Sequence, residues 1–149
     1  MSVEQAYNFV GIDPATATAG LLTAEQLQTL GDAGYEAVVN LLPHDSEFAL
    51  PSEQDLVRGQ GLEYHSIPVD FARPTARDYA DFVQAMQALQ GRKVLVHCAA
   101  NYRASAFYAI YAFQHLGWPL ERAQAHIASV WNPAEHPPWG DFIAGYLAG

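Results

Sequence analysis

One stretch decides the fold, and it reads Val94-Leu95-Val96-His97-Cys98-Ala99-Ala100-Asn101-Tyr102-Arg103-Ala104-Ser105. The segment from Lys93 to His97, which overlaps the beginning of this stretch, has an apolar centre and is short enough for a buried strand. From about Arg103 to Leu116 the chain is apolar nearly all round, which is typical of a helix buried on every side. A buried strand, a tight loop that begins at Cys98 and a buried helix in direct succession predict an α/β fold.

The loop between this strand and this helix has the features of an anion-binding site. Successive backbone N–H groups and the N-terminus of a helix converge on one point and attract negative charge. The same donors stabilise a thiolate, so we expect Cys98 to be nucleophilic. Arg103 adds a forked, permanently charged donor suited to phosphate or a sulfur oxyanion, and Ser105 adds a hydroxyl one turn into the helix. The alternative is a buried structural cysteine beside an arginine that merely caps or pairs.

The predicted binding groups surround the cysteine on both sides, and they are His97, Ala99, Ala100, Asn101, Tyr102 and Ala104. We expect His97 to hydrogen-bond the loop backbone and to help hold the thiolate rather than to act as a base. The other histidines, His115, His126 and His136, show no metal-ligand spacing with a carboxylate, so no metal site is predicted.

Helix and strand signals alternate on both sides of this stretch. Capping signals at Thr23, Ser52 and Thr75 predict three helix starts. The predicted strands are 37–42, 62–69 and 93–97, and the predicted helices are 24–30, 53–58, 76–90, 103–116, 120–130 and a short one from about 141. This order predicts one α/β domain over residues 1–149, with a central, mostly parallel sheet of about four or five strands flanked by helices.

Composition narrows the classes of function. The 149 residues are 50% hydrophobic by count, with 7 Lys and Arg against 16 Asp and Glu, which gives a net charge of −9. Such a charge repels nucleic acid and anionic membranes, so neither is an expected partner. A single cysteine excludes a disulfide scaffold and a Cys-rich zinc site. Residues 1–11 show no secretion signal, and no apolar run approaches the ~20 residues of a membrane span, so a cytoplasmic protein is expected.

The aromatic residues near the C-terminus are Trp131, Trp139, Phe142 and Tyr146. We interpret them as cover for the core or as a dimer contact rather than as a ligand site. The chain is therefore expected to be a monomer or a homodimer.

The motif resembles the phosphate-binding loop of cysteine-dependent protein tyrosine and dual-specificity phosphatases. The likeness lies in His97-Cys98 followed by Arg103 and Ser105. It extends backwards to Tyr64-His65-Ser66-Ile67-Pro68-Val69-Asp70, which resembles the strand and acid loop of compact dual-specificity phosphatases, and to Asn40-Leu41, which resembles their preceding strand. The resemblance covers roughly residues 20–130 and implies a compact phosphatase-like domain.

The resemblance implies hydrolysis of a phosphate monoester, with phosphotyrosine as one candidate, on a phosphorylated protein or small molecule and without a cofactor. Cys98 would attack phosphorus, and Arg103 would hold the equatorial oxygens. Asp70 would protonate the leaving oxygen, and Ser105 would help to release the thiol. Asp78 is the alternative acid, but its place in a first helical turn already gives it a structural role.

One departure from the family pattern concerns spacing. The family has five residues between cysteine and arginine, whereas four residues separate Cys98 from Arg103. Aligning the arginines shortens the loop by one residue. Aligning the cysteines instead keeps Ser105 in the family's hydroxyl position, puts Ala104 in place of the arginine, and sets Asn101 at a family glycine. We favour the second alignment because asparagine tolerates a left-handed backbone better than other non-glycine residues do.

The same spacing supports two other functions. Rhodanese-type sulfurtransferases use a six-residue loop in which an arginine often follows the cysteine after four residues. A catalytically weak module that binds a phosphorylated ligand is the third class. His97 and the Asp70 segment favour the phosphatase, and the loop length favours the rhodanese.

Overall fold

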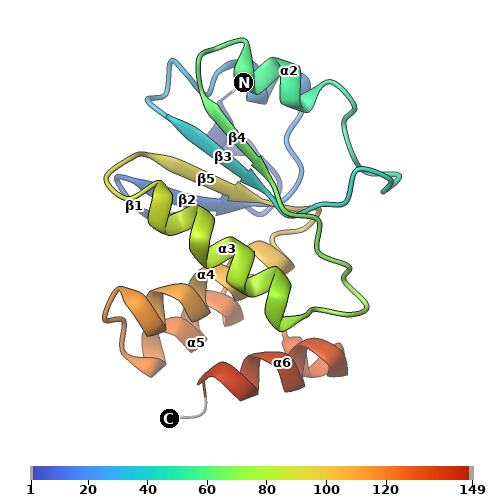
Figure 1. The fold of residues 1–149 in the computed structure, drawn as a ribbon, viewed down its shortest axis with the longest axis vertical. Coiled ribbons are helices and arrows are strands. Elements are labelled where there is room, and N and C mark those ends of the chain that lie inside the picture. The colour runs from blue at the N-terminus through green and yellow to red at the C-terminus, as the bar shows by residue number, and fades with distance from the viewer. Residues whose placement is uncertain (1, 148–149) are drawn as a thin grey trace.

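The central sheet has five strands in the order β1-β2-β5-β3-β4 (Figure 1). A computed structural model describes residues 2–147 of the chain. The strands are β1 (Val10–Asp13), β2 (Thr16–Ala19), β3 (Ala37–Asn40), β4 (Glu63–Ser66) and β5 (Val94–His97). β2, β5, β3 and β4 are parallel, whereas β1 pairs antiparallel with β2 in a hairpin. The predicted α/β class with a mostly parallel sheet of four or five strands is confirmed.

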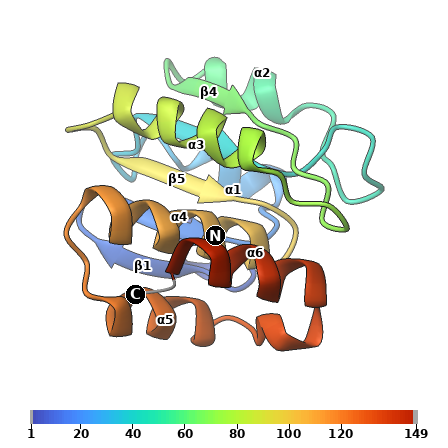
Figure 2. The ribbon, with the colours of Figure 1, turned by 60° about the horizontal axis from the view of Figure 1, so that its bottom comes forward.

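Helices cover both faces of this sheet, as the two views in Figures 1 and 2 show. They are α1 (Ala24–Gln28), α2 (Glu53–Arg58), α3 (Ala76–Ala88), α4 (Tyr102–His115), α5 (Leu120–Ala128) and α6 (Pro137–Leu147), with 3-10 turns at Val3–Gln5 and Pro133–Glu135. Side chains alternate along each strand, so Val38 packs in a core with α1 and α2, and Val39 packs in a second core with α3 to α6. None of the described helices is long and apolar enough to cross a bilayer.

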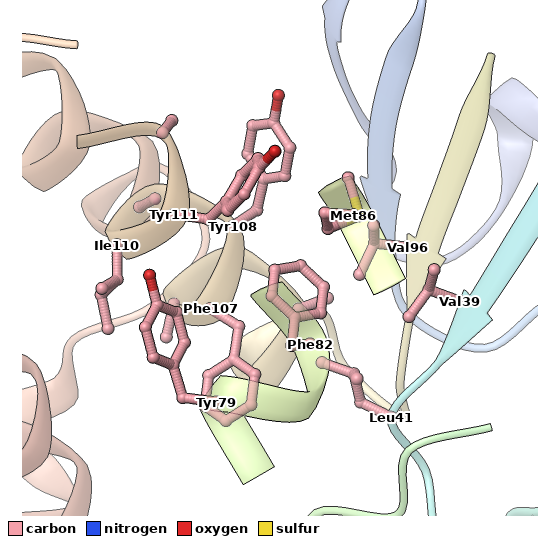
Figure 3. Packing of buried hydrophobic residues seen from close by; sticks show 14 of the residues in the cluster. Val39, Leu41, Tyr79, Phe82, Met86, Val96, Phe107, Tyr108, Ile110 and Tyr111 are labelled. Carbon is pink, nitrogen blue, oxygen red and sulfur yellow. The ribbon is translucent and has the colours of Figure 1, made fainter. Parts of the chain in front are cut away.

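Helix α4 is the buried centre of the larger core. Ten of its residues, from Arg103 to Ala112, are buried, as the all-round apolar pattern predicted. Phe107 on α4 lies against Tyr79 and Phe82 on α3, with ring centroids 5.6 Å apart in both pairs (Figure 3). This packing fixes α4 beneath the sheet, so the loop that leads into it has a rigid foundation.

Several element boundaries differ from the sequence predictions. The capping boxes at Thr23 and Thr75 are confirmed, but the Ser52 side chain makes no cap hydrogen bond although a helix starts at Glu53. The strand predicted at 37–42 ends at Asn40, whose Oδ1 accepts the backbone N–H of Leu42 at 2.9 Å. The strand predicted at 62–69 is shorter, at 63–66, and the hairpin of β1 and β2 was not predicted.

Candidate active site

A pocket of about 730 Å³ opens where the parallel strands end. Cys98 follows β5 directly, and residues 98–101 form the loop that leads into α4. The pocket is lined on the loop side by Cys98, Ala99, Ala100, Tyr102 and Arg103. Its opposite wall comes from two loops that follow β3 and β4, and includes Asp45, Phe48, Asp70 and Phe71. Residues from three strand ends thus meet at the edge of the sheet where ligands bind in α/β folds.

Each carbonyl of the loop is held by a donor that does not line this pocket. The four hydrogen bonds are His97 Nδ1 to Cys98 O (3.3 Å), Leu21 N to Ala99 O (3.0 Å), Asn8 Nδ2 to Ala100 O (3.0 Å) and Ser105 N to Asn101 O (2.9 Å). Because the C=O and N–H of a peptide point in opposite directions, a loop whose carbonyl oxygens face the protein can direct its N–H groups towards a ligand.

The loop amides complete this arrangement. Within residues 2–147, the backbone N–H groups of Ala99, Ala100, Tyr102 and Arg103 have no hydrogen-bond acceptor, and all four residues line the pocket. Those of Tyr102 and Arg103 belong to the first turn of α4, where helical N–H groups lack partners and the helix dipole is positive. Donors arranged in this way can bind an anion beside the Cys98 thiol.

Asn101 gives the loop its shape. Its backbone is left-handed, with φ 67° and ψ 7°, as the alignment with a family glycine predicted. The side chain is fully buried, and its Nδ2 donates to the carbonyl of Asn8 at 2.8 Å. The left-handed residue turns the chain from the strand into the helix within a short distance.

Arg103 brings the positive charge. It is 8% exposed, and its Nη1 donates to the carbonyl of Val69 at 2.9 Å. Its Nε is buried and has no partner among the described residues, and no carboxylate described there pairs with the guanidinium. The group lies 5.6 Å from the centre of the Phe71 ring. A buried guanidinium with an unused donor is costly unless an anion supplies the missing acceptor.

The two candidate acids separate clearly. Asp70 lines the pocket, and its Oδ1 accepts the N–H of Ala72 at 2.9 Å. Asp78 instead caps the N-terminus of α3, where it accepts the N–H of Thr75 at 3.3 Å. The structure therefore brings Asp70 into the pocket and leaves Asp78 in a capping role.

Ser105 and Ala104 lie outside this pocket. The Ser105 hydroxyl donates to the carbonyl of Tyr102 at 3.1 Å and accepts from the indole N–H of Trp131 at 3.2 Å. Trp131 also stacks on the Tyr102 ring, with centroids 4.5 Å apart and planes inclined by 5°. The Ser105 hydroxyl, which was expected to assist thiol release, is thus hydrogen-bonded to Tyr102 and Trp131 and does not line the pocket.

A buried pair of titratable groups, His97 and Glu53, lies next to the cysteine loop, and the sequence did not predict this pairing. His97 Nε2 lies 2.5 Å from Glu53 Oε2 at the start of α2, and both side chains are almost wholly buried. Tyr64 from β4 joins them, and its hydroxyl accepts from Asn40 Nδ2 at 2.9 Å. Burial, helped by the charge of Glu53, raises the pKa of Tyr64 to about 12. No periodic or spacing signal links Glu53 to His97, which lie 44 positions apart.

The arrangement defines a class of fold, that of the cysteine-based protein tyrosine and dual-specificity phosphatases. A structure of P. aeruginosa TpbA in complex with pTyr has a TM-score of 0.74 and 17% identity, over 93% of this chain and 83% of that one. The catalytic domain of the S. cerevisiae PP-IP phosphatase SIW14 has a TM-score of 0.76 and 12% identity, over 95% of this chain and 86% of that one. The predicted resemblance to these phosphatases is confirmed.

The particular family follows from a more similar protein. A DUF442 protein from Shewanella putrefaciens CN-32, provisionally named a phosphatase, is 35% identical with a TM-score of 0.89, over 98% of this chain and 95% of that one. The chain belongs to this DUF442 family of phosphatase-like proteins. Comparisons with protein-family models and with curated proteins gave no match.

Proposed function

We propose that the protein hydrolyses phosphate monoesters through a cysteinyl-phosphate intermediate. The observation that carries this proposal is the set of unused donors in one pocket: the backbone amides at 99, 100, 102 and 103 and the buried Nε of Arg103. A phosphoryl group supplies oxygen acceptors for all of them, next to the nucleophilic sulfur of Cys98. Preorganised donors of this kind stabilise the charge of a transferring phosphoryl group.

The reaction has two steps. In the first, Cys98 Sγ forms a bond to phosphorus, the bond to the ester oxygen breaks, and Asp70 gives its proton to that oxygen. In the second, water attacks phosphorus, Asp70 takes a proton from it, and the bond to sulfur breaks. Phe71 and Tyr102 flank the pocket with aromatic rings, which suits an aryl phosphate such as phosphotyrosine on a protein or a small molecule.

The test is turnover of an aryl phosphate by the purified protein and its Cys98→Ser variant. We expect the variant to lose turnover and to retain phosphate binding. Arg103→Lys is the matched second variant, because it keeps one positive charge and removes Nε; turnover should fall by about 10²-fold. If Cys98→Ser retained turnover, the assignment of Cys98 as the nucleophile would be wrong.

A second candidate function is sulfur transfer of the rhodanese type. Two observations favour it: the six-residue loop from Cys98 to Arg103, and the engagement of the Ser105 hydroxyl with Trp131. The Cys98 thiolate would attack the outer sulfur of thiosulfate, release sulfite and become a persulfide, from which cyanide would take sulfur to give thiocyanate. Formation of thiocyanate without phosphate release, on the same preparation, would select this function.

A third outcome would identify a binding module. If neither phosphate release nor thiocyanate formation is detected, and phosphate still protects Cys98 from an alkylating reagent, the site binds phosphoryl groups without turning them over.

A further inference from the structure

We propose that Asn8 is a positioning residue of the site, and this inference rests on the proposed binding of a phosphoryl group at the loop. The Asn8 side chain donates from Nδ2 to the carbonyl of Ala100 at 3.0 Å, and its own carbonyl accepts from Asn101 Nδ2 at 2.8 Å. We call this reciprocal pair of hydrogen bonds the asparagine clasp. Sequence reasoning did not single out Asn8, which lies 92 positions before Ala100.

Backbone conformation marks both members of the clasp. Among residues 2–147, Asn8 (φ 52°) and Asn101 (φ 67°) are the two non-glycine residues with positive φ. Such residues keep a left-handed backbone where surrounding contacts determine it, and they gather at functional sites. Here each left-handed residue aims its amide at the backbone of the segment opposite.

Close packing around the clasp ties the N-terminal segment to the cysteine loop. The N–H of Gly20 donates to the carbonyl of Tyr7 at 2.7 Å, and the N–H of Leu21 donates to the carbonyl of Ala99 at 3.0 Å. A Cβ on Gly20 would lie 2.8 Å from the Ala99 oxygen and 2.9 Å from the Tyr7 oxygen. Three backbone segments therefore touch at this point with no space for a side chain between them.

Within this contact, the Asn8 side chain fixes the direction of the Ala100 carbonyl, and the binding of an anion depends on that direction. Most of the donors around the loop are backbone N–H groups or belong to neighbouring residues, but the Ala100 carbonyl depends on one exposed side chain from a distant segment. Without that donor, the peptide between Ala100 and Asn101 is free to turn its oxygen towards the pocket. A carbonyl oxygen facing a phosphoryl oxygen repels it, so the anion site would be weakened while the sheet and helices stay as they are.

The deciding variant is Asn8→Gly. Glycine adopts a φ near 52° without strain, so the backbone turn is kept and only the side-chain donor is lost. We measure the concentration of inorganic phosphate that halves the rate of Cys98 alkylation, and in parallel the urea midpoint of unfolding. That phosphate concentration should rise about 10-fold, because the peptide after Ala100 is no longer held away from the pocket, and the urea midpoint should fall only slightly because the lost bond is exposed to solvent. A purely structural role would lower the midpoint and leave phosphate protection intact.

Asn8→Asp is the second variant. It keeps the size and the left-handed tolerance of asparagine but places a carboxylate oxygen against the Ala100 oxygen, so phosphate should protect Cys98 even less than in Asn8→Gly. Asn132→Gly is the control, because Asn132 caps a 3-10 turn and does not line this pocket, so its loss should not change protection. Wild-type protection in either Asn8 variant would overturn the proposal.

The experiment also separates this inference from the proposed hydrolysis. Phosphate that protects wild-type Cys98 but an aryl phosphate that is not turned over would refute hydrolysis and leave the comparison of Asn8 variants valid. A wild-type protein that phosphate does not protect would overturn both.

Discussion

His126 should make the stability of this protein fall in mild acid. The residue lies on α5 and is 8% exposed, with its Nε2 3.4 Å from the Thr18 hydroxyl. Its ring packs edge-on against Trp118 and Tyr108. Burial, with a smaller effect of the positive charge of Arg122, lowers the pKa of His126 from 6.5 to about 4.

The sign and size of the effect follow from this pKa. Above pH 6.5 the imidazole is neutral in the folded and unfolded chain alike, so it has little influence on stability. As the pH falls from 6.5 towards 4, the unfolded chain takes up a proton that the folded chain refuses, and the free energy of unfolding decreases. The two pKa values differ by about 2.5, so the full loss is about 3 kcal/mol below pH 4, and about 2 kcal/mol of it is reached at pH 5.

The assay compares urea unfolding at pH 7.5 and pH 5 for the wild type and His126→Gln. The variant removes the titrating group, so its loss of stability between the two pH values should be smaller than that of the wild type by about 2 kcal/mol. His115→Gln is the control, since His115 is exposed at the end of α4 and should leave the wild-type pH dependence unchanged. If His126→Gln lost as much stability as the wild type, the reasoning from burial would be refuted.

Three further predictions concern the loop and its surroundings. Asp70→Asn should slow hydrolysis of esters with poor leaving groups by about 10²-fold and hardly affect those with good ones; equal slowing in steady-state kinetics would discredit Asp70 as the acid. One glycine inserted after Tyr102 should lengthen the loop before Arg103, which the packing of α4 keeps on the Val69 carbonyl, so the backbone N–H groups at 99, 100 and 102 should no longer converge with the guanidinium. Turnover should then fall by about 10²-fold, and unchanged turnover would contradict the spacing argument. Asn101→Ala should cost about 2 kcal/mol in urea unfolding and Asn101→Gly about 1 kcal/mol less, because glycine keeps the left-handed backbone; equal losses would speak against backbone strain.

Local patterns predicted the elements whose signals are complete within a few residues. The capping boxes at Thr23 and Thr75 and the apolar surface of α4 each lie within one element, and all three predictions hold. The β1 and β2 hairpin escaped because its strands are rich in small residues and β2 gains its second neighbour from β5, far along the chain. Helix α6 begins at Pro137 rather than near residue 141, because prolines fit the first helical turn, where no N–H partner is required.

The residues of the candidate site also fall into two groups, those that local sequence predicted and those that only long-range contacts reveal. Cys98, Arg103 and Asp70 were chosen from local order and family resemblance, and the structure brings all three to one pocket. Glu53 and Asn8 could not be predicted, since their contacts with this region span 44 and 92 positions and follow no periodic pattern. Long-range hydrogen bonds of this kind become visible only when the strands have been placed in order.

The way in which the cysteine loop is held also bears on the order of folding. Its hydrogen bonds with Asn8 join parts of the chain 92 and 93 positions apart, and its bond from Leu21 requires that β2 already lies beside β5. Contacts between such distant residues close large loops and form slowly compared with helices and turns. A partly folded chain would therefore carry the Cys98 thiol before it possesses the cradle for an anion. The Cys98 thiol would react selectively with a bound ligand only after the last steps of folding. Before that it would react as an unassisted cysteine thiol does.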